Sequence, residues 1–217
     1  PHIARVINAG LKRALNDNPN YVMISGSDDV YPRGYIKTII KEMERNKRLV
    51  IASGYVVGES WHPSSPRGGG RIIKTKYLRL VGLYPLNYGW ETYLIIKAWS
   101  LGLETKVIPI PFMSKRHSMR NPIKFYFLGK GMKALGYNFL HSFLRALLIL
   151  PYCPQGSILL LRGYWSKANH YRDISLFTRY IRLKSFLLFL KKPQLLIYRV
   201  RGLLESLLVS YRLKTES

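Results

Sequence analysis

The chain has 217 residues, and its 35 lysines and arginines outnumber its 11 aspartates and glutamates, so the formal net charge is +24 at pH 7. With 47% hydrophobic residues the sequence is too apolar for a disordered protein, and its length suits one sizeable core or one domain with an appendage. The single cysteine, Cys153, excludes an internal disulfide framework and a cysteine-based zinc site. The positive charge predicts a polyanionic partner: a nucleotide, a nucleic acid or an anionic lipid surface.

The first 57 residues alternate between two patterns. Apolar residues spaced three and four apart indicate amphipathic helices, and short runs rich in apolar and β-branched residues indicate buried strands. The turn "NDNPN" and Pro32, which suits the first turn of a helix, mark boundaries. The expected elements are a helix over residues 3–15, a strand at 21–25, a helix at 32–46 and a strand at 49–57.

Residues 58–115 continue the alternation. The segment "GESWHPSSPRGGG" (residues 58–70) predicts a mobile loop. After it we expect a short strand and a helix ending at Gly82, then a helix closed by Gly102 as its C-cap, then the extended segment "TKVIPIPF". Strands that alternate with helices predict an α/β domain with a largely parallel sheet through about residue 115.

Beyond Arg120 the sequence becomes basic, aromatic and leucine-rich, and its only acidic residues are Asp173, Glu205 and Glu216. Segments such as "SLFTRYIRLKSFLLFLKK" and "RVRGLLESLLVSYRLK" predict basic amphipathic helices. Their apolar faces could pack on the preceding domain or lie on a membrane surface, and the sequence favours neither. No apolar run reaches the roughly 20 residues that a spanning helix needs.

Two adjacent carboxylates, Asp28 and Asp29, follow the predicted strand "YVMIS". Open α/β sheets bind ligands at the carboxyl ends of their strands, because the loops that leave the sheet there form a crevice. Carboxylate oxygens together with substrate phosphates are a usual shell for Mg²⁺ or Mn²⁺. The pair is therefore a candidate metal–diphosphate site, although aspartates are also common in turns and helix caps.

The wider pattern resembles glycosyltransferase family 2, whose members use nucleotide sugars and have the GT-A fold. The resemblance is carried by "ARVINAGLKRALNDNPNYVMISGSDDVYPRGYI", "GGGRIIKTKYLRLVGLYP" and "GWETYLIIKAWSLG", in this order and spacing. It covers about residues 1–120. It implies a partial GT-A-like, Rossmann-like catalytic domain with a mostly parallel sheet and flanking helices, followed by a basic amphipathic helical region over residues 121–217.

The resemblance also implies a donor site. Asp28 and Asp29 take the place of the family's DXD motif, which binds the divalent metal and the sugar-nucleotide diphosphate, and Asp29 is the stronger metal ligand. Gly26 stands where relatives often have another aspartate. Further contacts to the nucleotide, the donor sugar or the diphosphate are implied for Arg5, Asn8, Gly69, Gly70, His117 and Arg120, with His117 also a candidate metal ligand.

For catalysis, the family usually has Glu-Asp at the start of a helix below the acceptor site, and this chain has Glu91-Thr92. Glu91 is thus the implied base, unless it serves only to interact favourably with the helix dipole. The implied reaction is an inverting transfer from a nucleoside-diphosphate sugar, assisted by Mg²⁺ or Mn²⁺, to a glycan or polyprenyl-linked acceptor. The implied location is cytoplasmic and peripheral, at the cytoplasmic face of an anionic membrane.

Relatives begin with a strand and helix that bind the nucleotide base, so we expect that half to precede Pro1. Two alternatives stay open at this point. The charge and the aromatic residues interleaved with arginines in "LRGYWSKANHYRDISLFTRYIRLK" are compatible with a non-catalytic nucleic-acid-binding protein. Gly26 and Thr92 are compatible with a degenerate transferase that binds sugar nucleotides without turnover.

Overall fold

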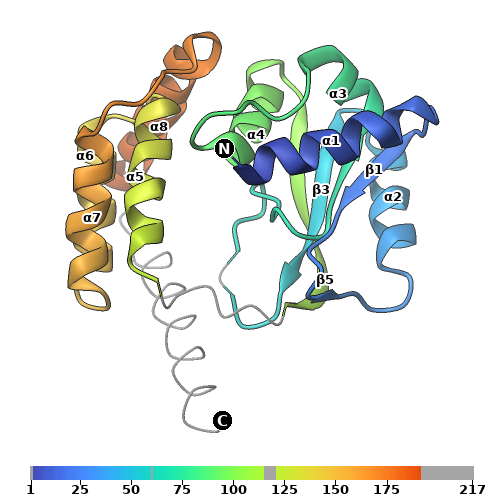
Figure 1. The fold of residues 1–217 in the computed structure, drawn as a ribbon, viewed down its shortest axis with the longest axis horizontal. Coiled ribbons are helices and arrows are strands. Elements are labelled where there is room, and N and C mark those ends of the chain that lie inside the picture. The colour runs from blue at the N-terminus through green and yellow to red at the C-terminus, as the bar shows by residue number, and fades with distance from the viewer. Residues whose placement is uncertain (1, 60, 115–120, 192–217) are drawn as a thin grey trace, which may run out of the picture. The chain divides into compact units, whose positions relative to one another are not determined.

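The computed structural model describes residues 2–59, 61–114 and 121–191 (Figure 1). The described residues fall into two compact units. The sheet unit contains those of residues 2–84 and 97–117, and the helical unit contains those of residues 85–96 and 118–201. Among them, no helix is both long and apolar enough to cross a bilayer.

The sheet unit is built on five strands among the described residues, in the order β1-β4-β3-β5-β2. Pairing is antiparallel between β1 and β4, β4 and β3, and β5 and β2, and it is parallel only between β3 and β5. The strands are β1 (Tyr21–Ile24), β2 (Asp29–Val30), β3 (Leu49–Val56), β4 (Arg71–Lys74) and β5 (Glu104–Ser114).

The predicted α/β class is confirmed, but the prediction of a mostly parallel sheet is wrong. A parallel pairing needs a crossover connection, usually a helix. The described residues between β3 and β4 form turns and contain no helix, so the chain returns antiparallel to β3. Between β3 and β5 the chain passes through α3 (Thr75–Val81) and α4 (Trp90–Ser100), and there the pairing is parallel.

Helices α1 (His2–Asn16) and α2 (Tyr35–Arg45) agree with the helices expected from the apolar spacing. Tyr35, Ile39 and Met43 of α2 recur every fourth residue and are buried against β3, β4 and β5. Burying each such side chain contributes about 1.5–3 kcal/mol. The ammonium group of Lys74 donates to the carbonyls at the end of α2, those of Met43 (2.8 Å), Asn46 (3.2 Å) and Lys47 (3.2 Å).

In its described part the helical unit contains the first part of α4 and four further helices, so the predicted helical character beyond residue 120 is confirmed as far as residue 191. Glycines bring two of these helices together: a Cβ on Gly129 would collide with the Leu160 carbonyl, and one on Gly163 with the Tyr126 carbonyl. The predicted helix "RVRGLLESLLVSYRLK" lies outside the described residues. The four helices are α5 (Ile123–Ala134), α6 (Phe139–Ile149), α7 (Pro154–Trp165) and α8 (Arg172–Lys191).

Candidate functional site

The loop that carries Asp28 and Asp29 crosses one end of the sheet. Ile24, the last residue of β1, pairs with Arg71, the first residue of β4. Asp29 opens β2 and pairs with Ser114 of β5. Because β4 and β3 lie between β1 and β5, the connecting residues 25–28 pass over the end at which β4 begins. The two carboxylates therefore stand beside the glycines that precede β4.

Asp29 is held by its own loop. Its Oδ2 accepts a hydrogen bond from the backbone N–H of Gly26 at 2.9 Å and another from the Tyr31 hydroxyl at 3.0 Å. Both bonds fall on the same oxygen, which leaves Oδ1 to point elsewhere. A Cβ on Gly26 would come within 2.7 Å of Oδ2, so this N–H donates at close range only because the residue has no side chain. Gly26 thus provides an anchor for Asp29.

Gly69 and Gly70 form the other wall of the loop. A Cβ on Gly69 would collide with the Asp29 carboxylate, so these two chain segments touch through a bare backbone. The Gly70 carbonyl accepts from the Tyr35 hydroxyl at 2.8 Å, and that hydroxyl in turn accepts from the backbone N–H of Gly54 at 2.7 Å. Burial raises the pKa of Tyr35, so its hydroxyl keeps its proton at neutral pH.

Arg71 fixes the glycine-rich segment from behind. Its side chain is 2% exposed. The guanidinium donates to the carbonyls of Pro66 (2.8 Å) and Arg67 (2.9 Å) and to the Tyr84 hydroxyl (3.2 Å). The segment that the composition predicts to be mobile is thus held at residues 66 and 67 by the buried guanidinium of Arg71.

The sequence did not predict a role in this site for the Tyr31 and Tyr35 side chains, nor that Arg71 is a buried cation. The available signal was weak. Tyr31 and Tyr35 follow Asp29 by two and six residues, and Arg71 directly follows three glycines at the start of an apolar strand. An arginine in the buried strand "RIIK" needs partners, and here backbone carbonyls supply them.

The other predicted donor-site residues lie on α1 or outside the described part of the chain. Arg5 is exposed on α1. The Asn8 amide donates to the Tyr84 carbonyl at 2.7 Å and accepts from the Tyr84 N–H at 3.0 Å, so it fastens the chain that follows α3. His117 and Arg120 fall among the residues that the structure does not describe. Their predicted contacts remain predictions.

Glu91 belongs to the helical unit, whereas the aspartate loop belongs to the sheet unit. It lies in the first turn of α4 and is exposed. The structure thus sets Asp29 against Gly69 and Gly26, places Asp28 beside Gly26, and describes Glu91 by its place in α4.

The aspartate loop can take a hard divalent cation. Within the described ranges, no group of three or more histidine, cysteine or acidic side chains converges. Asp28 and Asp29 would supply two carboxylates, and the remaining ligands would have to come from water or from a substrate's phosphates. Mg²⁺ is usually bound in this way, through one or two carboxylates plus phosphate oxygens. The residues present therefore fit such an ion.

A family model agrees with the family predicted from the sequence. The model of glycosyl transferase family 2 matches residues 2–98, which include the aspartate loop, Gly69, Gly70 and Glu91. No curated protein gives a significant match. Among solved structures, the chain is similar to the mannosyltransferase PcManGT from Pyrobaculum calidifontis in complex with GDP-Man and Mn²⁺. That likeness has a TM-score of 0.48 and 12% identity, and it covers 94% of this chain and 66% of the other.

The predicted family is confirmed on the segment that carries the candidate site. The matched residues run from the start of α1 into α4 and contain both carboxylates of the loop. Residues 2–98 of this α/β chain match the model of glycosyl transferase family 2.

Proposed function

We propose that the chain transfers a sugar from a nucleoside-diphosphate sugar to an acceptor hydroxyl, with inversion at the anomeric carbon. The observation that carries the proposal is the Asp29 carboxylate, held through Oδ2 by Gly26 and Tyr31 and set against Gly69, within a family 2 segment. Bare glycine backbone on two sides lets the Asp29 carboxylate pack closely against its loop, which fixes its orientation.

On the donor side, Asp28 and Asp29 would hold Mg²⁺ or Mn²⁺. A bound cation there would neutralise the charge that develops on the departing diphosphate. Tyr31 and Gly26 keep Asp29 oriented before any ligand arrives, so little ordering is needed on binding. Arg5, Asn8, His117 and Arg120 remain the proposed contacts to the nucleotide and the diphosphate, and His117 remains a candidate metal ligand.

On the acceptor side, Glu91 is the proposed base. The acceptor oxygen attacks the anomeric carbon and gives its proton to the Glu91 carboxylate, while the bond from that carbon to the diphosphate oxygen breaks and the nucleoside diphosphate leaves. A general base contributes typically about 10²–10⁴-fold. The exposure of Glu91 in the first turn of α4 supports access to an incoming substrate.

The acceptor is proposed to be a glycan or a polyprenyl-linked sugar at the cytoplasmic face of a membrane, to which the chain binds peripherally. The net charge of +24 supports an anionic surface as the partner. Nucleic acid is the less favoured partner, because the family 2 segment accounts for a polyanionic ligand in the form of a nucleotide diphosphate.

Ligand binding tests the donor site without requiring turnover. Mn²⁺ binding, followed by the loss of the free-ion electron paramagnetic resonance signal, is measured with and without UDP or GDP. We expect Asp29→Asn to weaken Mn²⁺–nucleotide binding by at least about tenfold, because one of two carboxylate ligands is lost. Asp17→Asn, an equal change of charge at an exposed position of the same unit, is the control and should bind like the parent. Equal binding by both variants would remove Asp29 from the metal site.

Sugar transfer tests the base. Release of nucleoside diphosphate from a panel of UDP- and GDP-sugars is measured with candidate acceptors. Glu91→Gln should lower the rate by about 10²-fold or more while the circular dichroism spectrum is unchanged. Glu44→Gln, at an exposed position of α2, is the matched control. Full activity of Glu91→Gln would show that another group takes the proton.

A further inference from the structure

Helix α6 turns its large apolar side chains outward. Its buried residues are the small Ser142 and Ala146. An amphipathic helix of a globular protein in water normally has the opposite arrangement, with its large apolar residues on the buried face. The exposed apolar residues of α6 are Phe139, Leu140, Phe143, Leu144, Leu147 and Leu148.

The inner side of α6 is held by a buried hydrogen bond to α7, and its first turn is capped. The Ser157 hydroxyl of α7 donates to the Ala146 carbonyl at 2.7 Å, a buried bond between the two helices. The Asn138 side chain accepts from the His141 N–H at 3.0 Å and caps the start of α6. Because these contacts fix the orientation of α6 in the unit, its large apolar side chains face outward.

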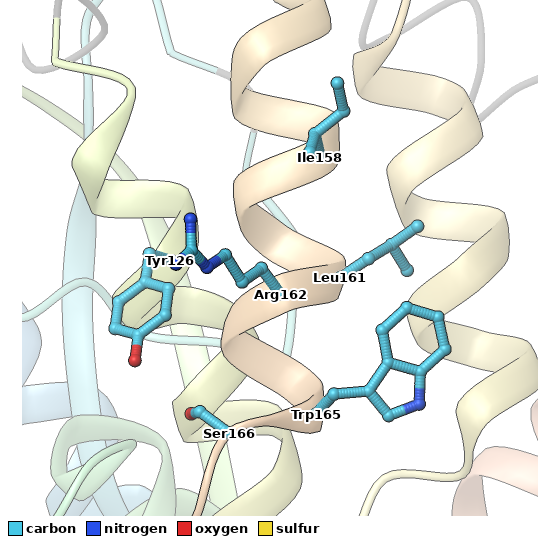
Figure 2. Close-up of a pocket in the computed structure, with 6 residues that line it drawn as sticks. All are labelled: Tyr126, Ile158, Leu161, Arg162, Trp165 and Ser166. Atoms are coloured by element: carbon cyan, nitrogen blue, oxygen red, sulfur yellow. The ribbon is translucent and has the colours of Figure 1, made fainter.

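The apolar surface continues from α6 onto α7. The Phe139 ring lies 5.9 Å from that of Phe143 and stacks at 5.3 Å on Trp165, which is 66% exposed. From Trp165 a groove of about 490 Å³ runs along α7 and is lined by Ile158, Leu161 and Arg162 (Figure 2). We call the following residues the α6–α7 face: Phe139, Phe143, Leu147, Ile158, Leu161 and Trp165.

Arg162 gives this surface a cationic edge. Figure 2 shows its side chain extending along the groove toward Tyr126 of α5, while Leu161 and Trp165 point to the other side of α7. The groove therefore pairs apolar walls with a guanidinium, an arrangement that suits an amphiphile with an anionic head and a hydrocarbon tail.

The charge of residues 121–191 favours one kind of partner for the α6–α7 face. Between residues 121 and 191 the sequence has eleven lysines and arginines, and Asp173 is its only acidic residue. A second copy of the chain would bring the same excess of positive charge to the interface, and like charges oppose association. An anionic lipid surface attracts the basic residues of this region electrostatically. Tryptophan and tyrosine are also the residues enriched at the boundary between headgroups and hydrocarbon.

We infer that the α6–α7 face docks into the interfacial layer of an anionic lipid bilayer, with Phe139, Phe143 and Trp165 among the upper acyl chains and Arg162 at the phosphates. Exposed contiguous apolar surface of this kind marks an interaction site, and α6 is too short to span a bilayer. The inference deepens the peripheral membrane association proposed above by naming its surface. It does not depend on sugar transfer.

Vesicle co-sedimentation of the full chain tests the surface. We compare phosphatidylcholine vesicles with vesicles rich in phosphatidylglycerol, at low and high salt. Phe143→Ser/Leu147→Ser should weaken binding to the anionic vesicles by at least about tenfold, since two side chains no longer enter the hydrocarbon. Ile3→Ser/Val6→Ser removes two exposed apolar side chains from α1 of the sheet unit and should bind within about twofold of the parent.

A second measurement reports directly on depth. Lipids with brominated acyl chains quench tryptophans that enter the hydrocarbon layer. We expect quenching in the parent protein to be largely lost in Trp165→Phe, which keeps the apolar ring and hence the binding. Quenching that is unchanged in Trp165→Phe would mean that another surface enters the bilayer.

The remaining outcomes separate the surface from the peripheral location itself. If Leu176→Ser/Leu183→Ser on α8 abolishes binding and the α6 variant does not, the chain is peripheral but the named surface is wrong. If the parent binds neither kind of vesicle, both proposals fail. If light scattering instead shows a dimer that Phe143→Ser/Leu147→Ser converts to a monomer, the face is a contact between copies and the lipid inference is overturned.

Discussion

Helices α2 and α6 have the same length of 11 residues but bury opposite kinds of side chain. In α2 the buried positions carry Tyr35, Ile39 and Met43, which close the core over the sheet. In α6 they carry Ser142 and Ala146, and the large apolar residues face outward. An apolar stripe on a helix thus predicts only that the stripe is shielded from water. Its neighbours decide whether the cover is the protein's own core or an external partner.

Polar groups also differ between the two units in what they hold in place. In the sheet unit, the carboxylate of Asp29 is held by Gly26 and Tyr31 above buried tyrosines. In the helical unit, the buried hydroxyl of Tyr164 in α7 donates to the carbonyl of Tyr137, in the connection between α5 and α6, at 2.7 Å. We therefore expect the hydroxyls of the sheet unit to affect ligand binding and those of the helical unit to affect stability alone.

The largest expected effect tests whether α2 and α6 differ in what covers their apolar faces. Ile39→Ala, at a side chain with 0% exposure, should lower the free energy of unfolding by about 3 kcal/mol, because it leaves a cavity in the core. Leu147→Ala, at a side chain that is 46% exposed, should cost less than about 1 kcal/mol. Urea denaturation measures both. Similar losses would mean that the outer face of α6 is covered in solution.

A smaller effect compares one buried tyrosine in each unit. Tyr35→Phe leaves both the Gly70 carbonyl and the Gly54 N–H without their partner and should destabilise the protein by about 2 kcal/mol. Tyr164→Phe leaves one carbonyl unpaired and should cost about 1 kcal/mol. Thermal and urea unfolding measure the two losses. Nucleotide binding should weaken only in Tyr35→Phe, and a loss in Tyr164→Phe would contradict the division of roles.

Tyr31→Phe sharpens the assignment of Asp29. It removes one of the two donors to Oδ2 and leaves the ring contacts with Tyr35 and Phe112. We expect Mn²⁺–nucleotide binding to weaken about fivefold, equivalent to about 1 kcal/mol, with little change in stability. Tyr55→Phe, at a half-buried ring that stacks on Trp61 in the same unit, is the control. An equal effect of Tyr31→Phe and Tyr55→Phe would show that the Tyr31 hydroxyl has no specific role in Mn²⁺–nucleotide binding.

The smallest effect is confined to alkaline pH. Burial raises the pKa of Tyr31 to about 12 and also raises the pKa values of Tyr35, Tyr93 and Tyr171. In the unfolded chain these groups lose their protons near pH 10. The contribution of these tyrosines to the free energy of unfolding should therefore be constant up to about pH 10 and fall as the pH rises from 10 toward 12, because the unfolded state then binds fewer protons. Denaturation series at successive pH values measure this slope, which should be shallower in Tyr31→Phe.

Some elements of the fold were predicted correctly from the sequence and others were not. The helices α1, α2 and α3 and the end of α4 near Gly102 follow from apolar spacing and glycine caps, which depend on neighbours in the chain. The family was predicted from motif order and confirmed over residues 2–98. Strand direction was predicted wrongly, since a loop rich in glycine and proline is equally compatible with a crossover and with a return.

The sequence by itself determined the mixture of helices and strands, the excess of positive charge and the pair of carboxylates at a strand's end, because these depend on composition and on residues close together in the chain. Only the tertiary structure decided that Gly26 anchors Asp29, that Arg71 holds residues 66 and 67, and that α6 faces outward. Each of these depends on contacts, such as that of Gly69 with Asp29, whose partners are fixed by packing across the fold. An apolar pattern gives a helix two faces, and only its neighbours decide which one is inside.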